Sequence, residues 1–175
     1  MTFTELFISG AFLIDLELRE DERGFFARLF CEKEFAVHGL MPRIVQVNDS
    51  YCKFKGTLRG MHYQLDPHSE DKMVRCLRGR IFDVVLDLRK SSPTFGRWYG
   101  CELTQDNRKM LYIPKMCAHG FITLEDDSEI LYLHSQFHAP SAERGVRWDD
   151  PKFKIQWPFK PKIISKRDQQ FPLYT

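Results

Sequence analysis

The sequence predicts an all-β domain built as a β-sandwich, a jelly roll or a barrel, with one or two short helices. Apolar residues alternate with other residues in short runs, which is the pattern of strands that bury one face. Turn-forming residues such as Arg78-Gly79, Ser91-Ser92 and Asp126-Asp127 separate the runs. Eight or more short strands at this spacing are typical of sandwiches and barrels.

The predicted strands follow one another along the chain, and one convincing helix interrupts them. This helix extends from about Glu32 to His38, begins with an acidic turn and ends before Gly39, and a further helical turn is a candidate near 140–143. Asp83 and Asp87 share one face of their predicted strand with apolar residues, which calls for a polar role. The predicted strands are Phe12 to Leu18, Gly56 to Gln64, Lys72 to Leu77, Ile81 to Arg89, Trp98 to Leu103, Met110 to Pro114, Gly120 to Leu124, Ile130 to Ser135 and Phe153 to Trp157.

Chain length and composition predict one folded domain over residues 1–175. The 175 residues are close to the size of one typical domain. Hydrophobic residues make up 43% and aromatic residues 14%, which supplies a core and excludes a disordered chain. The C-terminal stretch WPFKPKIISKRDQQFP is rich in proline and basic residues, but its apolar residues predict that it packs on the domain.

Charge and cysteine usage exclude several classes of partner. The 26 basic and 24 acidic residues give a net charge of +2, so no global field attracts nucleic acid or an anionic membrane. No run approaches 18 apolar residues, and Glu5 precedes the first basic residue, Arg19, unlike a secretory signal. The five cysteines form no C-x-x-C pair, which fits reduced, packed thiols. We therefore expect a cytoplasmic protein whose anionic ligands are bound by local clusters.

One constellation resembles the metal-binding strands of jelly-roll proteins of the cupin type. Gly56 is followed after five residues by His62, then by Gln64 and Glu70, and His119 follows Pro114. Gln64 occupies the place of a second histidine, and its carbonyl oxygen is a weak ligand for a first-row metal. We therefore expect no metal, which leaves the histidines free for proton chemistry. A metal-dependent cupin with His62, Gln64, Glu70 and His119 as ligands stays open as an alternative.

His62 could also be an ordinary hydrogen-bonded residue, as most strand histidines are. Its neighbours favour a functional interpretation, because Arg59 precedes it and Lys72 follows on the next predicted strand. A solvated face with extended basic side chains is the simpler explanation of those cations. It does not account for Asp83 or for the pair His119-Gly120.

Eight blocks in order resemble the dTDP-4-dehydrorhamnose 3,5-epimerase family, from about Phe12 to Pro172. The blocks are DERGFFARLF (21–30), QVNDS (46–50), TLRGMHYQ (57–64), KMVRCLRGRIFDVVLDLRKSSPTFGRW (72–98), IPKMCAHGFITL (113–124), ILY (130–132), ERGVRWDDP (143–151) and IQWPF (155–159). The resemblance implies a cupin jelly roll, usually a homodimer, that acts without metal or other cofactor. It implies a nucleotide-linked 4-keto-6-deoxy sugar as substrate, in deoxysugar biosynthesis.

The resemblance also implies catalytic roles for four residues. The C4 ketone acidifies the protons on C3 and C5, so epimerisation needs a base on one face and an acid on the other. His62 matches the family base, and Asp168 matches the carboxylate that orients it. Tyr132 matches the acid on the opposite face, and Lys72 the cation beside the developing O4 oxyanion.

Further matches imply the residues that bind the substrate. Asp83 and His119 are expected to hold Lys72 and the sugar in place. Phe137 is expected to stack on the base of the substrate's nucleotide. The segment Arg23 to Phe26 is expected to reach the site of the neighbouring subunit, although Arg23 and Gly24 could simply form a turn before an edge strand. The positions that match the nucleotide diphosphate contacts are Arg59, Arg23, Gln46, Asn48, Glu143 and Arg167.

Departures from the family pattern leave the exact substrate open. Arg19 and Arg28 stand where the family often has an aromatic residue and a glutamate, and Leu133-His134 stand where it favours lysine and a small residue. The nucleotide could therefore be dTDP, GDP or CDP, and inversion could occur at both C3 and C5 or at C3 alone. A non-catalytic cupin that binds sugar nucleotides is a further alternative, which the presence of all four catalytic matches disfavours.

Overall fold

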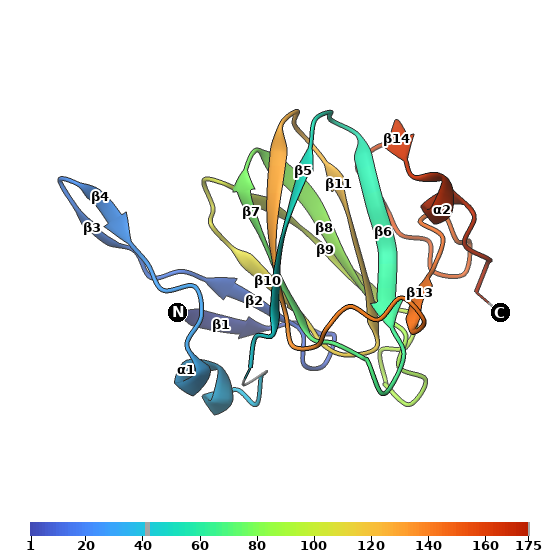
Figure 1. Cartoon of the computed structure of the whole chain (residues 1–175), viewed down its shortest axis with the longest axis horizontal. Coiled ribbons are helices and arrows are strands. Elements are labelled where there is room, and N and C mark those ends of the chain that lie inside the picture. Colours follow the sequence, from blue (N-terminus) through green and yellow to red (C-terminus); the bar gives the residue numbers. More distant parts are fainter. Residues whose placement is uncertain (41–42, 175) are drawn as a thin grey trace.

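Two antiparallel sheets face each other in this structure, a computed structural model that describes residues 1–40 and 43–174 (Figure 1). The first sheet has the order β1-β2-β10-β7-β12-β5, and the second has the order β13-β6-β11-β8-β9 with β14 beside β6. The strands of the first sheet are β1 (Thr2–Glu5), β2 (Phe12–Asp15), β10 (Met110–Ile113), β7 (Lys72–Arg78), β12 (Ser128–His134) and β5 (Gln46–Cys52). Those of the second are β13 (Glu143–Gly145), β6 (Thr57–Gln64), β11 (Cys117–Thr123), β8 (Arg80–Asp87), β9 (Trp98–Thr104) and β14 (Ile163–Ile164). The predicted all-β architecture is confirmed.

The main core lies between the two sheets, where both contribute inward apolar side chains. Val74, Leu111 and Ile130 of the first sheet pack in one cluster with Val85 and Phe121 of the second. All five are fully buried, and burying each such side chain contributes roughly 1.5–3 kcal/mol. The period-two alternation of the sequence therefore marks the faces that meet.

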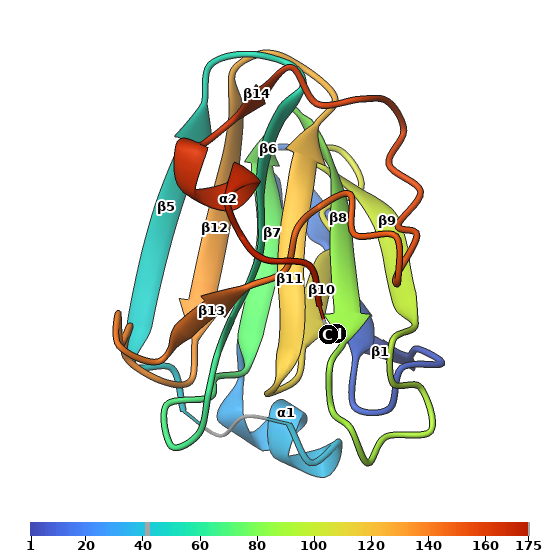
Figure 2. The same ribbon diagram turned by 90° about the vertical axis from the view of Figure 1, so that its right-hand side faces the viewer.

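The outer face of each sheet is covered by a different segment. Helix α1 (Glu32–Val37) covers the first sheet through Phe35, which is fully buried against Met73 and Leu133. Trp157 and Tyr174, from the C-terminal stretch, pack on the second sheet. Figure 2 shows this stretch crossing the outside of β6 and β11, as expected for a tail that packs on the domain.

The structure differs from the sequence prediction in several places, which include the unpredicted short strands β1, β13 and β14, and two of the differences have a clear physical reason. The stretch Phe153 to Trp157 is not a strand: Lys154 has a left-handed φ of 50°, and the Trp157 indole donates to the Trp148 carbonyl at 2.8 Å. Its apolar residues serve to anchor a loop. Conversely, β5 was not predicted, because it is a sheet-edge strand whose side chains are mostly polar and exposed.

Two short elements near the ends of the chain complete the fold. The hairpin of β3 (Arg19–Asp21) and β4 (Gly24–Phe26) projects from the body, and all six of its strand residues are exposed (Figure 1). Helix α2 (Lys166–Gln169) lies beside β6, where the Ser165 side chain caps it by accepting from the Asp168 backbone N–H. Among the described residues, no helix is long and apolar enough to cross a membrane.

Strands β6 and β11 approach each other closely at two glycines. A Cβ atom on Gly60 would lie 2.5 Å from the Gly120 Cα, so neither strand tolerates a side chain there. Gly60 also has a φ of +131°, which L side chains rarely adopt. The approach sets the register in which His62 lies directly opposite His119.

Candidate active site

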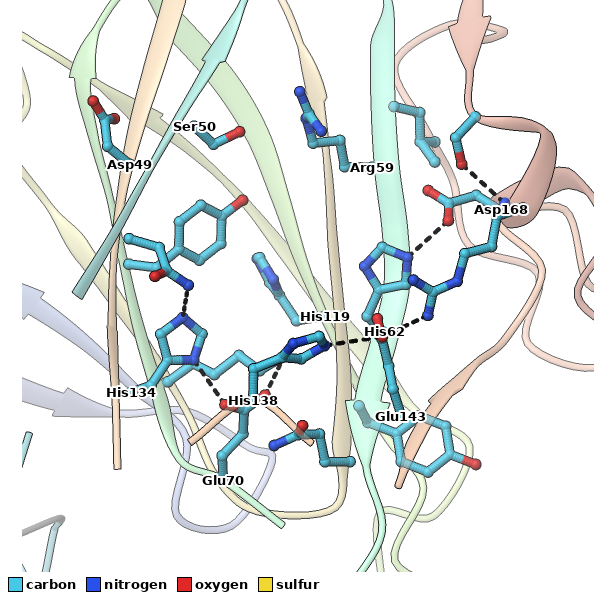
Figure 3. Close-up of a pocket in the computed structure, with 18 of the residues that line it drawn as sticks. Asp49, Ser50, Arg59, His62, Glu70, His119, His134, His138, Glu143 and Asp168 are labelled. Atoms are coloured by element: carbon cyan, nitrogen blue, oxygen red, sulfur yellow. Dashed lines mark hydrogen bonds and ion pairs between the residues drawn. The ribbon is translucent and has the colours of Figure 1, made fainter. Parts of the chain in front are cut away.

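A cavity of about 980 Å³ opens between the two sheets and carries most of the residues predicted for the site. Strands β5, β7 and β12 form one wall, and β6, β11 and the segment from β14 to α2 form the other. The predicted residues that line it are His62, Asp168, Tyr132, Lys72, Gln46, Asn48, Arg59, His119, Glu143 and Arg167. Figure 3 labels five of them, Arg59, His62, His119, Glu143 and Asp168, around this space.

His62 and Asp168 form a hydrogen-bonded pair on the β6 wall. The His62 Nε2 lies 2.8 Å from Asp168 Oδ1, and the Gly60 backbone N–H donates to Asp168 Oδ2 at 3.2 Å. Burial alone would raise the pKa of Asp168, but its hydrogen bonds and the charge of His62 hold that pKa below its usual range. An ionised Asp168 fixes the proton of His62 on Nε2 and leaves Nδ1 as an acceptor, which is the form of a general base.

Tyr132 extends into the cavity from β12, in the sheet that faces β6. Its ring stacks on His134 at 6.0 Å and meets the edge of the His119 ring at 5.9 Å. Burial, followed by the charge of Asp83, raises the pKa of Tyr132 well above its usual value. The phenol therefore stays protonated at neutral pH and can act as an acid.

Lys72 is held by Glu70, not by the predicted partner Asp83. The Lys72 Nζ lies 3.0 Å from Glu70 Oε1, and His134 Nδ1 lies 2.7 Å from Glu70 Oε2. In the sequence, Glu70 stands out only as a candidate metal ligand and His134 only as a departure from the family pattern. Their contact depends on the path of the loop before β7, which alternation does not reveal.

Asp83 is instead the partner of His119. The two side chains are 2.7 Å apart, and Asp83 is fully buried on β8. Burial raises the pKa of Asp83, while His119 and the charge of Lys72 act in the opposite direction. The charge of Lys72 therefore reaches Asp83, but the two make no hydrogen bond, so the predicted contact is wrong in its direct form.

Basic side chains line the cavity at two places along β6. Arg59 donates from its guanidinium to the Cys52 sulfur and the Tyr51 carbonyl at 3.4 Å, so the guanidinium is held in place. Near the other end of β6, Arg167 pairs with Glu143 at 2.7 Å, and His138 contacts the same carboxylate at 3.1 Å. These basic groups can bind an anionic ligand through charge-assisted hydrogen bonds.

Besides Asp83, three predicted residues do not line the cavity of their own chain. Arg23 pairs with Asp21 on the projecting hairpin, and Phe26 is 68% exposed there. Phe137 is 60% exposed and does not line the cavity; its carbonyl accepts a hydrogen bond from Gln64 at 3.2 Å. The stacking of Phe137 on the base of a bound nucleotide stays a prediction.

The residues of the metal-dependent alternative are all bonded to other groups of the protein. Both ends of the Gln64 amide bond to backbone groups, at His68, Phe137 and Ala139. His62 and His119 each pair with an aspartate, and Glu70 with Lys72 and His134. Across residues 1–40 and 43–174, no group of three His, Cys, Asp or Glu side chains could hold a metal ion. The donor set does not fit a metal.

Two facing sheets around a cavity lined by polar side chains are the architecture of a cupin-type protein, and the known proteins that this chain resembles are isomerases. A family model described as dTDP-4-dehydrorhamnose 3,5-epimerase matches residues 5–175. The chain is 44% identical over 149 residues to the dTDP-4-dehydrorhamnose 3,5-epimerase of Shigella flexneri, covering 85% of this chain and 82% of the relative. The chain belongs to the dTDP-4-dehydrorhamnose 3,5-epimerase family.

Solved structures support the same assignment. The dTDP-4-dehydrorhamnose 3,5-epimerase of Bacillus anthracis, with TDP and PPi bound, superposes with a TM-score of 0.95 at 36% identity and covers 99% of both chains. A 3'-monoepimerase from Streptomyces bikiniensis, in complex with dTDP-quinovose, superposes with a TM-score of 0.87 at 33% identity, covering 95% of this chain and 85% of that one. The chain is therefore similar both to an enzyme named for epimerisation at two centres and to one named for epimerisation at a single centre.

Proposed function

We propose that this protein converts dTDP-4-dehydro-6-deoxyglucose to dTDP-4-dehydrorhamnose by inverting C3 and C5, without a metal or other cofactor. The proposal depends on one observation: the His62–Asp168 pair and the protonated Tyr132 lie on facing sheets of the same cavity. Lys72, which lies between His62 and Tyr132 in the sequence, lines this cavity too. Membership of the epimerase family supplies the substrate class.

The proposed reaction begins with proton abstraction by His62. Its Nδ1 takes the proton from C3 or C5, the C–H electron pair becomes the C=C bond of an enolate, and the carbonyl electron pair moves to O4. The Lys72 ammonium, which is buried in the cavity wall, stabilises the negative charge on O4. Asp168 stabilises the imidazolium that forms.

Reprotonation from the opposite face completes the inversion. Tyr132 donates its phenolic proton to the carbon, and the enolate returns to a ketone. The imidazolium of His62 then releases its proton and the tyrosinate regains one, so that no proton is gained or lost overall. The family relative that acts as a 3'-monoepimerase makes inversion at C3 alone the second candidate.

We also propose a homodimer in which the hairpin 19–26 completes the neighbouring site, and a cytoplasmic location. The hairpin carries exposed Phe25 and Phe26 on a projection that contacts little of its own body (Figure 1). Burying these rings in a partner is favourable. The five free thiols suit a reducing compartment.

Proton NMR in deuterated water tests the proposal. We expect dTDP-4-keto-6-deoxyglucose to lose both its C3 and C5 proton signals when incubated with the protein, and a chelator to leave the rate unchanged. Loss of one signal would assign a single-centre epimerase. Loss of neither, with the GDP- and CDP-linked sugars equally inert, would contradict the function.

A further inference from the structure

A continuous chain of hydrogen bonds runs along one wall of the cavity and ends on Lys72. It contains Gln46 and Asn48 of β5, His134 of β12, and Glu70 from the loop before β7. His134 lies directly opposite Lys72 in the register of β12 and β7, so Glu70 can reach both (Figure 3).

A fixed donor at one end determines the direction of every bond in the chain. The His138 backbone N–H can only donate, and it donates to Gln46 Oε1 at 3.2 Å. The Gln46 amide N–H then donates to Asn48 Oδ1 at 3.2 Å. The Asn48 amide nitrogen in turn faces His134 Nε2 at 3.3 Å, so Nε2 accepts and the imidazole proton is on Nδ1.

The proton on His134 Nδ1 makes a hydrogen bond to the Glu70 carboxylate, which also pairs with Lys72. His134 Nδ1–H donates to Glu70 Oε2 at 2.7 Å, and Lys72 donates to Oε1 at 3.0 Å. Burial alone would raise the pKa of Glu70, but the hydrogen bond from His134 and the charge of Lys72 outweigh it and lower that pKa. With both oxygens bonded, the carboxylate cannot rotate.

The backbone next to Glu70 is hydrogen-bonded to the residue that directly follows β12. The Asp71 N–H donates to the Ser135 hydroxyl at 2.8 Å, and the Ser135 N–H donates to the Asp71 carbonyl at 3.0 Å. Glu70, Lys72 and His134 are each less than a tenth exposed. Both the backbone and the side chains of this arrangement are therefore held in place, unlike those of an exposed surface ion pair.

We propose that Glu70 is a positioning residue for Lys72, and that the hydrogen-bonded chain through His134 fixes the Glu70 carboxylate in the orientation that aims the Lys72 ammonium into the cavity. The inference rests on the proposed function, because Lys72 acts there on the O4 oxyanion. Glu70 touches no reacting atom and acts through Lys72 alone.

A double-mutant cycle tests whether Glu70 acts through Lys72. With dTDP-4-keto-6-deoxyglucose, we expect Glu70→Ala to lower kcat about 10²-fold and to leave KM within roughly threefold. We expect Lys72→Met to lower kcat at least as much, and the double variant to be no slower than Lys72→Met. Wild-type kcat in Glu70→Ala, or losses that multiply in the double variant, would overturn the inference.

A matched control separates positioning from stability. Asp87→Asn also alters a buried carboxylate with several hydrogen bonds, but Asp87 does not line the cavity. We expect this variant to lower Tm and keep kcat. Glu70→Gln keeps the side-chain shape if Glu70→Ala does not fold. We expect its kcat to fall because its one carbonyl oxygen can replace only one of the two carboxylate oxygens, so its NH2 group faces either the Lys72 ammonium or the His134 Nδ1–H. Unchanged kcat in Glu70→Gln would count against the role.

The nitrogen NMR signals of His134 give a readout that does not depend on turnover. In the wild-type protein we expect the proton on Nδ1 and an unprotonated Nε2 that accepts from Asn48. A proton on Nε2 would break the chain and overturn the inference. If the wild-type protein exchanges no C3 or C5 proton, the proposed function fails, and the nitrogen spectrum still decides the direction of the chain.

Discussion

His62 and Asp168 contact each other at 2.8 Å between Nε2 and Oδ1, although 106 residues separate them in the sequence. Asp168 is presented by the two-residue strand β14 and the short helix α2, which are fastened to β6 by parallel pairing and by the hydrogen bonds of Lys162 and Ile163 to Gly56. A C-terminal segment that resembles a solvated tail in sequence therefore sets the tautomer of the base. Substitution of Asp168 tests whether this contact is needed for catalysis.

Asp168→Asn is expected to lower kcat by about 10²- to 10⁴-fold and to leave dTDP affinity nearly unchanged. The amide cannot stabilise an imidazolium on His62, and it can present an N–H to Nε2 that favours the wrong tautomer. Turnover assays and calorimetric titration with dTDP measure the two quantities. His62→Asn is the control, and we expect a loss at least as large; a wild-type rate in either variant would remove the pair from the mechanism.

Tyr132→Phe is expected to block inversion more than proton exchange. His62 can still remove the proton and return a deuteron to the same face, while the opposite face lacks its acid. NMR in deuterated water should show exchange at C3 or C5 in substrate that keeps its configuration. Equal loss of exchange and inversion would mean that Tyr132 is not a separate acid.

Alternation in the sequence predicts most of the core strands, because burial on one face constrains every second residue. It does not predict β5 or the loop that Phe153 begins, where exposure or irregular backbone removes the constraint. The catalytic residues were found by family resemblance, and ten of the matched positions line the cavity. Glu70 as the partner of Lys72 was missed, because that pair depends on the three-dimensional path of residues 65–71.

Arg59→Ala is expected to raise KM with little change in kcat. Arg59 lines the cavity, where its planar guanidinium can contact phosphate oxygens in pairs. Steady-state kinetics with dTDP-4-keto-6-deoxyglucose separates the two constants, and Arg59→Lys should recover only part of the affinity. A defect confined to kcat would place Arg59 at the reacting centre instead.

Asp87 should make the protein less stable in acid. Burial alone would raise the pKa of Asp87, but hydrogen bonds from Arg89, Ser92 and Thr94 hold it well below its usual range. A carboxylate with a lowered folded-state pKa stabilises the fold fully above pH ~4, and this contribution is lost as the pH falls through the folded-state pKa.

Asp87→Asn is therefore expected to lower the free energy of unfolding at pH 7 by about 2 kcal/mol. The difference from wild type should shrink as the pH falls below ~4, because the carboxyl of the unfolded wild-type chain becomes protonated there while the folded carboxyl stays ionised until lower pH. Urea unfolding at pH 7 and at pH ~3 measures both values. A difference that stays constant over this range would show that the charge of Asp87 does not contribute.

The final prediction concerns the hairpin 19–26 and uses two variants that are each inactive alone. The first is the double variant Arg23→Ala, Phe26→Ala, which leaves the barrel intact, and the second is His62→Asn, which leaves the hairpin intact. If the hairpin completes the neighbouring site, a heterodimer of the two contains one site with an intact barrel and an intact hairpin. Co-expression with two affinity tags isolates this heterodimer, and we expect it to show about half of the wild-type kcat.

The opposite arrangement gives a different result with the same material. If each hairpin serves its own cavity, both sites of the heterodimer carry a defect, and activity stays at the level of the variants. Size-exclusion chromatography of the wild-type chain and of both variants controls for assembly, because loss of the Phe26 ring could weaken a dimer as well as empty a site. Restored activity in a heterodimer of normal size therefore assigns the exposed hairpin to the neighbouring subunit, and absence of restoration in that same species assigns it to its own.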